Sequence, residues 1–148
     1  AFGMTVLIGQ LPNRPEQSDR HPLAELLPCI DALTLHCPLN EQTRNLIGAA
    51  ELALMKPGAF VVNTGRGGLI DEHALADALR RGHLGGAATD VLTVEPPTAE
   101  HPLLADLPRL IVTPHCAWGS KEARQRILSQ IGENACAFSK GESLRVVS

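Results

Sequence analysis

The chain has 148 residues, of which 44% are hydrophobic and 20% are charged, and its formal net charge is -3. A sequence of this size and polarity forms at most one folded domain with its own core, which excludes an intrinsically disordered chain. Lys and Arg are dispersed, so we expect no nucleic-acid partner, and no apolar run approaches the roughly 18 residues of a membrane span.

Short apolar runs typical of strands alternate with segments of helical periodicity. The predicted strands are Met4–Gly9, Asp31–His36, Ala59–Asn63, Gly86–Val91 and Leu110–Thr113. The predicted helices between them are Leu23–Leu27, Ala49–Met55 and Asp71–Arg81, the last with Asp71 as its N-cap. Because most strands are apolar throughout, we expect helices on both faces of the sheet. This alternation predicts an α/β fold with a doubly wound parallel sheet.

The pattern changes after His115, where Lys121–Lys140 forms one long amphipathic segment. Its apolar positions at helical spacing are Ala123, Ile127, Ile131, Ala135 and Phe138. The strands already have their own helices, so we expect this helix to form a separate packing unit. Its apolar stripe would then pack against a partner outside this chain.

The four cysteines, Cys29, Cys37, Cys116 and Cys136, include no C-x-x-C pair. They are interpreted as buried or free thiols in a reducing compartment, which favours the cytoplasm. Cys37 and Cys116 each follow a histidine, and zinc accepts such ligands. A tetrahedral site built from adjacent residues is sterically awkward, so we expect no metal.

Ligands of doubly wound sheets bind outside the carboxyl ends of the strands, where this sequence places several polar residues. Arg66 lies among small residues and offers a bidentate fork to a carboxylate, although an isolated arginine is more often part of a surface salt bridge. His115 could serve as a general acid if a carboxylate such as Glu95 oriented it. From these residues alone, the alternatives are a histidine whose hydrogen bonds are satisfied within the fold and a solvated glutamate in a loop.

Four motifs in order resemble one enzyme family. They are Leu35-His36-Cys37-Pro38-Leu39 with Thr43, Val62-Asn63-Thr64-Gly65-Arg66-Gly67 followed by Asp71-Glu72, Gly86-Ala87-Ala88-Thr89-Asp90-Val91 with Glu95-Pro96, and Thr113-Pro114-His115. Together they resemble the D-isomer-specific 2-hydroxyacid dehydrogenases over nearly the whole chain. The resemblance implies a Rossmann-type domain and hydride transfer between a nicotinamide cofactor and a small 2-keto or 2-hydroxy acid.

The resemblance also implies catalytic roles. Arg66 would bind the substrate carboxylate and carbonyl, His115 would exchange the hydroxyl proton, and Glu95 would hold His115. Asp90 would meet the nicotinamide carboxamide, with a capping role as the alternative. The expected cofactor-binding residues are Gln10, Arg14, Cys37, Pro38, Thr43, Thr64, Gly65, Arg66, Asp90, His115 and Ala117; the expected substrate-binding residues are Arg66, His115 and Trp118.

The choice between NAD and NADP depends on the end of the first predicted strand. An acidic residue usually stands there and binds the ribose 2′-hydroxyl, but this chain has Gln10, with Arg14 just beyond. A carboxylate would repel a 2′-phosphate and Gln10 would not. We therefore lean slightly to NADP over NAD, with a solvated Arg14 as the alternative.

The resemblance is closest to the glycerate dehydrogenase, or hydroxypyruvate reductase, branch, because Ala117-Trp118 follows the histidine. It implies hydroxypyruvate or glyoxylate as substrate and a homodimer when full length. No G-x-G-x-x-G unit precedes Met4, so we expect an N-terminally truncated nucleotide-binding domain over 1–117, inactive by itself, and over 118–148 a helix and tail returning to the substrate domain. The alternative function is an NAD(H)-sensing interaction module of corepressor type.

Overall fold

The computed structural model describes residues 3–15 and 17–146, and these form two compact units. The first unit is Ala1–Pro114 and the second is His115–Ser148. The two units are described separately below.

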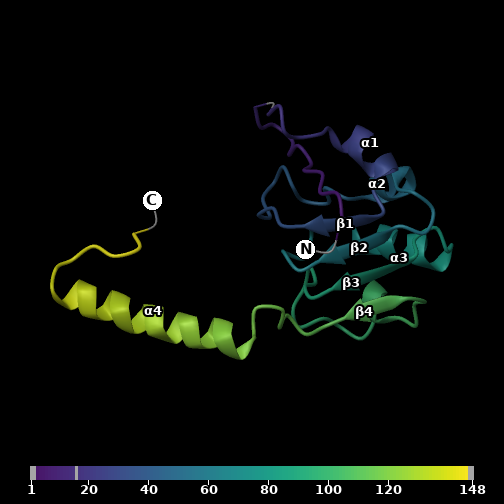
Figure 1. The fold of residues 1–148 in the computed structure, drawn as a ribbon. Coiled ribbons are helices and arrows are strands. Elements are labelled where there is room, and N and C mark those ends of the chain that lie inside the picture. The colour runs from purple at the N-terminus through teal and green to yellow at the C-terminus, as the bar shows by residue number, and fades with distance from the viewer. Residues whose placement is uncertain (1–2, 16, 147–148) are drawn as a thin grey trace. The chain divides into compact units, whose positions relative to one another are not determined.

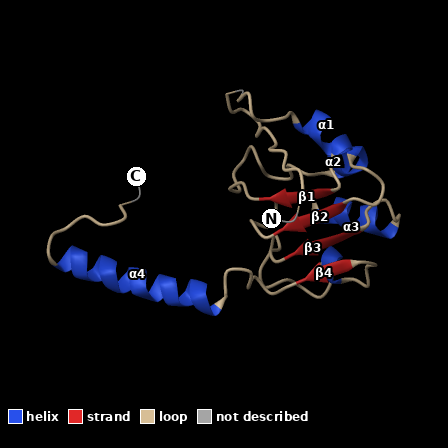
Figure 2. Ribbon diagram, in the orientation of Figure 1, coloured by secondary structure: helices blue, strands red, loops and turns tan. Residues whose placement is uncertain are grey.

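The first unit is built on a four-stranded parallel sheet (Figures 1 and 2). Its strands are β1 (Ala32–Leu35), β2 (Phe60–Asn63), β3 (Gly86–Thr89) and β4 (Leu110–Val112), and they neighbour one another in chain order. Leu33 pairs with Val61, which in turn pairs with Ala87. The predicted α/β class and the last four predicted strands are thereby confirmed.

The helices of this unit begin and end where local sequence predicts. They are α1 (Leu23–Leu26), extended by the 3₁₀ turn η1 (Leu27–Cys29), then α2 (Ala49–Leu54), α3 (Glu72–Arg80) and the 3₁₀ turn η2 (Pro102–Leu104). Asp71 caps α3, because its carboxylate accepts hydrogen bonds from the backbone N–H groups of His73 and Ala74. Gly82 follows α3 with a φ of 69°, a left-handed conformation that ends helices.

The core lies on one face of the sheet only. Leu33, Leu35 and Val61 are buried, as are Leu52 of α2 and Leu75 of α3. On the opposite face, Phe60 and Ile111 remain 53% and 64% exposed. The expectation of helices on both faces is therefore wrong for the described residues. Strands in consecutive order, joined by crossovers of one hand, place all their helices on the same side of the sheet.

The first predicted strand, Met4–Gly9, is also wrong. Within the described residues this segment joins no sheet, and its only ladder contact is an isolated bridge between Gly9 and His21. Val6 is 79% exposed. The local pattern is that of a strand, but an extended segment becomes one only when a neighbouring strand accepts and donates its backbone hydrogen bonds.

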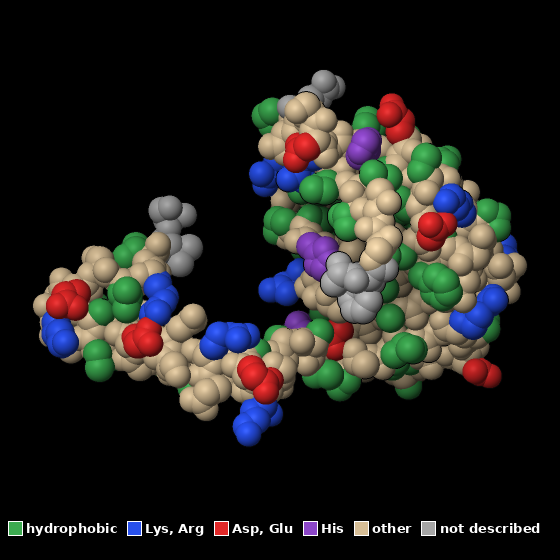
Figure 3. Space-filling model, in the orientation of Figure 1, with side chains coloured by type: hydrophobic (Ala, Val, Ile, Leu, Met, Phe, Trp, Pro, Cys, Tyr) green, Lys and Arg blue, Asp and Glu red, His purple; other side chains and the backbone are tan. Residues whose placement is uncertain are grey.

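The second unit consists of helix α4 (Lys121–Ser139) and the segments flanking it. Ser120 caps the helix by accepting a hydrogen bond of 3.1 Å from the backbone N–H of Ala123. Ile131 and Phe138 are 59% and 86% exposed, and Figure 3 shows acidic, basic and hydrophobic side chains mixed along the helix. The predicted helix is confirmed. None of the helices described is both long and apolar enough to cross a membrane.

Candidate active site

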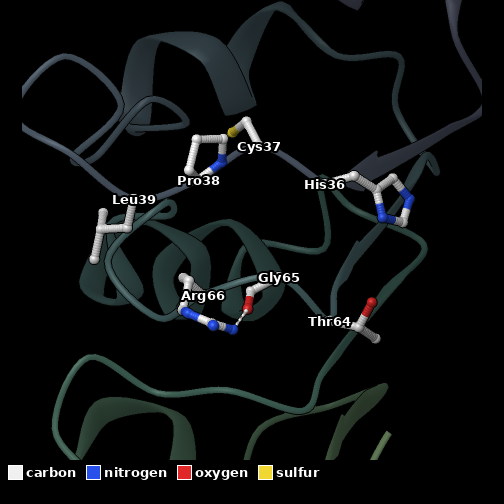
Figure 4. Close-up of a pocket in the computed structure, with 7 residues that line it drawn as sticks. All are labelled: His36, Cys37, Pro38, Leu39, Thr64, Gly65 and Arg66. Atoms are coloured by element: carbon white, nitrogen blue, oxygen red, sulfur yellow. Dashed lines mark hydrogen bonds between the residues drawn. The ribbon is translucent and has the colours of Figure 1, made fainter. Parts of the chain in front are cut away.

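A cavity of about 710 Å³ lies at the carboxyl ends of β1 and β2 (Figure 4). It is lined by His36, Cys37, Pro38, Leu39, Thr64, Gly65 and Arg66, and therefore by residues of two of the motifs singled out in the sequence. The cavity has the position that the rule for parallel sheets predicts. The two turns that form it face each other across the opening in the close-up.

The turn after β2 is shaped by Asn63, the last residue of that strand. Asn63 is 2% exposed; its Nδ2 donates to the carbonyl oxygen of Arg66 at 2.9 Å, and its Oδ1 accepts from the N–H of Gly65 at 3.0 Å. A Cβ on Gly65 would lie 3.1 Å from the carbonyl oxygen of Leu35, which is tighter than most such contacts. Sequence reasoning missed Asn63; its signal is a polar residue that ends an apolar strand.

Arg66 is exposed at the mouth of the cavity. Its Nη1 donates to the carbonyl oxygen of Gly65 at 2.8 Å, the bond drawn in Figure 4. This bond restrains the direction of the guanidinium group and uses one of its five N–H donors. The other donors are therefore available to an anion in the cavity.

The turn after β1 is held together by Thr43. This threonine is 2% exposed, and its Oγ1 donates to the carbonyl oxygen of Pro38 at 2.7 Å while accepting from the N–H of Asn40 at 2.9 Å. Its hydroxyl group thus lies inside the turn and positions Pro38. Cys37 is half-buried at the cavity wall, and burial raises the pKa of its thiol.

Asp90 follows β3 and is 4% exposed. Its N–H donates to the carbonyl oxygen of Asn63 at 2.9 Å, which places Asp90 beside the residue that precedes Thr64. Its Oδ1 accepts a hydrogen bond of 2.6 Å from Oγ1 of Thr113, which follows β4. A buried carboxylate is therefore fixed at the same sheet edge as the cavity.

Glu95 lies on the segment that follows β3, and its Oε1 accepts from the N–H of Leu92 at 2.7 Å. The Arg66 turn packs directly against this segment, because a Cβ added to Gly67 would overlap the carbonyl group of Leu92. The structure thus brings the segments of two predicted catalytic residues, Arg66 and Glu95, together within the first unit.

The remaining predicted site residues belong to the second unit or to the N-terminal segment of the first. His115, Ala117 and Trp118 begin the second unit, where His115 has a φ of 52° and its carbonyl oxygen accepts from Nε1 of Trp118 at 3.0 Å. In the first unit, Nε2 of Gln10 donates to the carbonyl oxygens of Arg14 and Pro15, at 3.1 Å each. The Arg14 side chain is exposed.

Two further findings concern metals and thiols. Within residues 3–15 and 17–146, no three His, Cys, Asp or Glu side chains gather closely enough to hold a metal ion. All four cysteines are unbridged; Cys29, Cys116 and Cys136 are exposed. Of the two expected alternatives, buried or free, these three cysteines are therefore free thiols at the surface.

Comparisons with known proteins identify the same family that these motifs resemble. The family model described as "D-isomer specific 2-hydroxyacid dehydrogenase, NAD binding domain" matches residues 1–117. Glycerate dehydrogenase of Methylorubrum extorquens is 50% identical over 126 residues, which are 84% of this chain and 40% of that protein. Glyoxylate reductase of Aeropyrum pernix is 40% identical over 147 residues, which are 96% of this chain and 44% of that protein.

A solved structure has the same fold. The TT0316 protein of Thermus thermophilus superposes with a TM-score of 0.77 at 39% sequence identity, over 88% of this chain and 42% of that one. The predicted Rossmann-type fold is thereby confirmed. The chain spans less than half the length of each of these three proteins.

Proposed function

Because the chain belongs to the D-isomer specific 2-hydroxyacid dehydrogenase family, we propose that it is the nucleotide-binding part of a protein that reduces a small 2-keto acid. The preferred substrates are hydroxypyruvate and glyoxylate, which give D-glycerate and glycolate. The observation that carries the proposal is Arg66, which lies at the mouth of the cavity with guanidinium donors available to a carboxylate.

The residues at this sheet edge fit a nicotinamide group. Pro38 and Leu39 offer an apolar wall for a flat ring, and the backbone of Thr64 to Arg66 can approach closely because Gly65 has no side chain. The buried carboxylate of Asp90 suits the amide N–H of the ring's carboxamide. When bound, the nicotinamide group supplies the hydride that the reduction needs.

The chain's own residues would do the remaining chemistry. Arg66 binds the substrate carboxylate and polarises the keto oxygen, which becomes more negative as the carbonyl carbon is reduced. His115 donates a proton to that oxygen, giving the hydroxyl group of the product. Glu95 would hold His115 in the orientation that this proton transfer needs. Thr43 acts indirectly, because its hydroxyl group is occupied inside the turn that carries Pro38.

NADP is the cofactor that we propose in preference to NAD. Gln10 carries no negative charge that would repel a 2′-phosphate, and the exposed guanidinium of Arg14 is available to such a group. The test is a side-by-side measurement of NADPH and NADH affinity in the full-length protein and in Gln10→Asp. We expect the substitution to weaken NADPH binding much more than NADH binding; equal losses would contradict this assignment.

Arg66→Ala in the full-length protein tests the activity itself. Because an unanchored substrate loses both binding and orientation, we expect turnover of hydroxypyruvate and glyoxylate to fall by orders of magnitude. Arg44→Ala, an exposed arginine outside the cavity lining, is the matched control. Unchanged turnover in Arg66→Ala would overturn the proposal.

The rival function is a module that senses NAD(H) and recruits a protein partner. Such a module would bind dinucleotide but reduce no keto acid, and it would tolerate Arg66→Ala. The Ala117-Trp118 pair that follows His115 resembles the glycerate dehydrogenase branch and therefore favours the reductase.

We further propose a cytoplasmic homodimer for the full-length protein. We expect negligible turnover for the 148-residue chain alone, because it carries no G-x-G-x-x-G loop to bind the pyrophosphate.

A further inference from the structure

A buried imidazole and a partly buried carboxylate form a pair outside the cavity. Nε2 of His101 lies 3.0 Å from Oε2 of Glu72, and their side chains are 8% and 13% exposed. Glu72 is the first residue of α3 and His101 immediately precedes η2, so the pair joins positions 29 residues apart. Groups this polar are seldom buried unless their hydrogen bonds are satisfied.

Every polar atom of the pair is occupied. Oε1 of Glu72 accepts from the backbone N–H of Thr93 at 2.8 Å, and Nδ1 of His101 accepts from the N–H of Leu103 at 3.3 Å. Since Nδ1 accepts, the ring proton sits on Nε2 and is donated to Glu72. One carboxylate therefore holds the segment between β3 and β4 at two places, directly at Thr93 and through His101 near Leu103.

This segment carries Glu95. Thr93 directly follows Leu92, whose N–H donates to Glu95 at 2.7 Å. Leu92 is also the residue against which Gly67 packs, next to Arg66. Glu72 thus fixes the backbone at Thr93, next to the place where the Glu95 segment packs against the Arg66 turn. Movement at Thr93 would displace Glu95 relative to Arg66.

We propose that Glu72 and His101 are positioning residues that hold Glu95 in its working place; this inference rests on the proposed function, which gives Glu95 its role. Position 72 requires a side chain with two hydrogen-bond acceptor atoms, because the backbone N–H of Thr93 and the ring N–H of His101 each donate to one of them. A carboxylate meets that requirement. A carboxamide cannot, since its NH₂ group would oppose one of the two donors.

The test uses the full-length protein with Glu72→Gln, which keeps the size of the side chain and removes one acceptor. We expect kcat for hydroxypyruvate to fall roughly 10- to 100-fold, as small displacements of catalytic groups do, with KM and cofactor affinity within about two-fold. Asp77→Asn is the matched control. It breaks an exposed pair with Arg80 on the same helix and should leave kcat unchanged.

Position 101 supplies the rescue experiment. The side chain of the His101→Gln variant can place an N–H near the position of Nε2 and still donate to Glu72. The side chain of the His101→Leu variant has no donor. We expect His101→Gln to retain several-fold more kcat than His101→Leu at matched folded content, measured by circular dichroism. Equal losses in the two variants, or losses that follow only the unfolded fraction, would mean that the pair merely stabilises the fold and would overturn the inference.

Glu95→Gln in the same assay separates the two proposals. If Glu95→Gln loses kcat and Glu72→Gln does not, the positioning role is wrong and the proposed function stands. If Glu95→Gln keeps full kcat, the role given to Glu95 is wrong, and the inference about Glu72 and His101 fails with it.

Discussion

Thr113 and Asp90 are joined by a hydrogen bond of 2.6 Å from the threonine hydroxyl to the aspartate carboxylate. The bond ties the end of β4 to the end of β3 and restrains the buried carboxylate at the candidate site. Thr113 lies two residues before His115, at the end of the first unit. Its hydroxyl group therefore matters for the geometry of the site and for local stability.

Thr113→Val tests this relationship. Valine has nearly the same shape and no hydroxyl group, so Asp90 loses that donor, which costs about 1 to 3 kcal/mol of unfolding free energy. We also expect weaker binding of the nicotinamide cofactor, measured by fluorescence titration. Thr113→Ser keeps the donor and should behave as the unmodified protein; equal effects of Ser and Val would show that the methyl group is responsible.

Gly67→Ala should be among the most damaging single substitutions at this edge. The added Cβ overlaps the backbone of Leu92, which cannot rotate away as a flexible side chain can. We expect a loss of at least about 2 kcal/mol of unfolding free energy, followed by urea denaturation, and a large loss of turnover. Gly132→Ala is the control, because nothing lies within 4 Å of its Cβ and alanine favours helix α4.

Asp71→Ala removes the N-cap of α3. The carboxylate accepts from two backbone N–H groups, at 3.0 and 3.1 Å, that would otherwise have no partner within the helix. We expect the unfolding free energy to fall by about 1 kcal/mol. Asp71→Asn retains a capping oxygen and should lose less. If Asp71→Ala left the unfolding free energy unchanged, the cap would contribute nothing to the stability of this fold.

Cys37 predicts a pH dependence. Burial raises the pKa of its thiol above the usual 9.0, so the folded protein holds this proton more tightly than the unfolded chain does. The stability contributed by this thiol is therefore complete below pH 9.0 and is lost as the pH rises through the folded-state pKa. The unfolding free energy should fall less steeply above that pH in Cys37→Ala than in the unmodified protein; identical slopes would contradict the assignment.

Arg66→Lys separates charge from geometry at the cavity mouth. Lysine keeps the positive charge but lacks the planar fork that binds a carboxylate through two parallel hydrogen bonds. We expect a large rise in the KM for hydroxypyruvate, with NADPH affinity nearly unchanged. If lysine restored the full kcat/KM, a point charge alone would be sufficient and the bidentate role would be wrong.

Much of the site could be predicted from the sequence because its residues follow strands with strong local patterns. The segments before Cys37, Thr64 and Asp90 are short and apolar, and each ends in a polar residue. In a parallel sheet such ends meet at one edge. The motifs containing Arg66, Glu95 and His115 are local as well, and they were sufficient to identify the family that the comparisons confirmed.

Other features depended on contacts between distant segments. Met4–Gly9 has the pattern of a strand, yet it joins no sheet in the described residues, because backbone pairing requires a partner that local sequence does not specify. The exposed face of the sheet, with Phe60 and Ile111, follows from the strand order and the hand of the crossovers. Both were expected differently from local patterns.

The sequence by itself determined the order of strands and helices, the caps and the residue types at the strand ends, because these depend on periodicity and on hydrogen bonds within a few residues. Only the tertiary structure decided that Gly67 packs on Leu92 and that Glu72 holds Thr93 and His101. Those contacts join residues more than 20 positions apart. They exist because α3 packs beside the segment between β3 and β4, which depends on how the whole first unit folds.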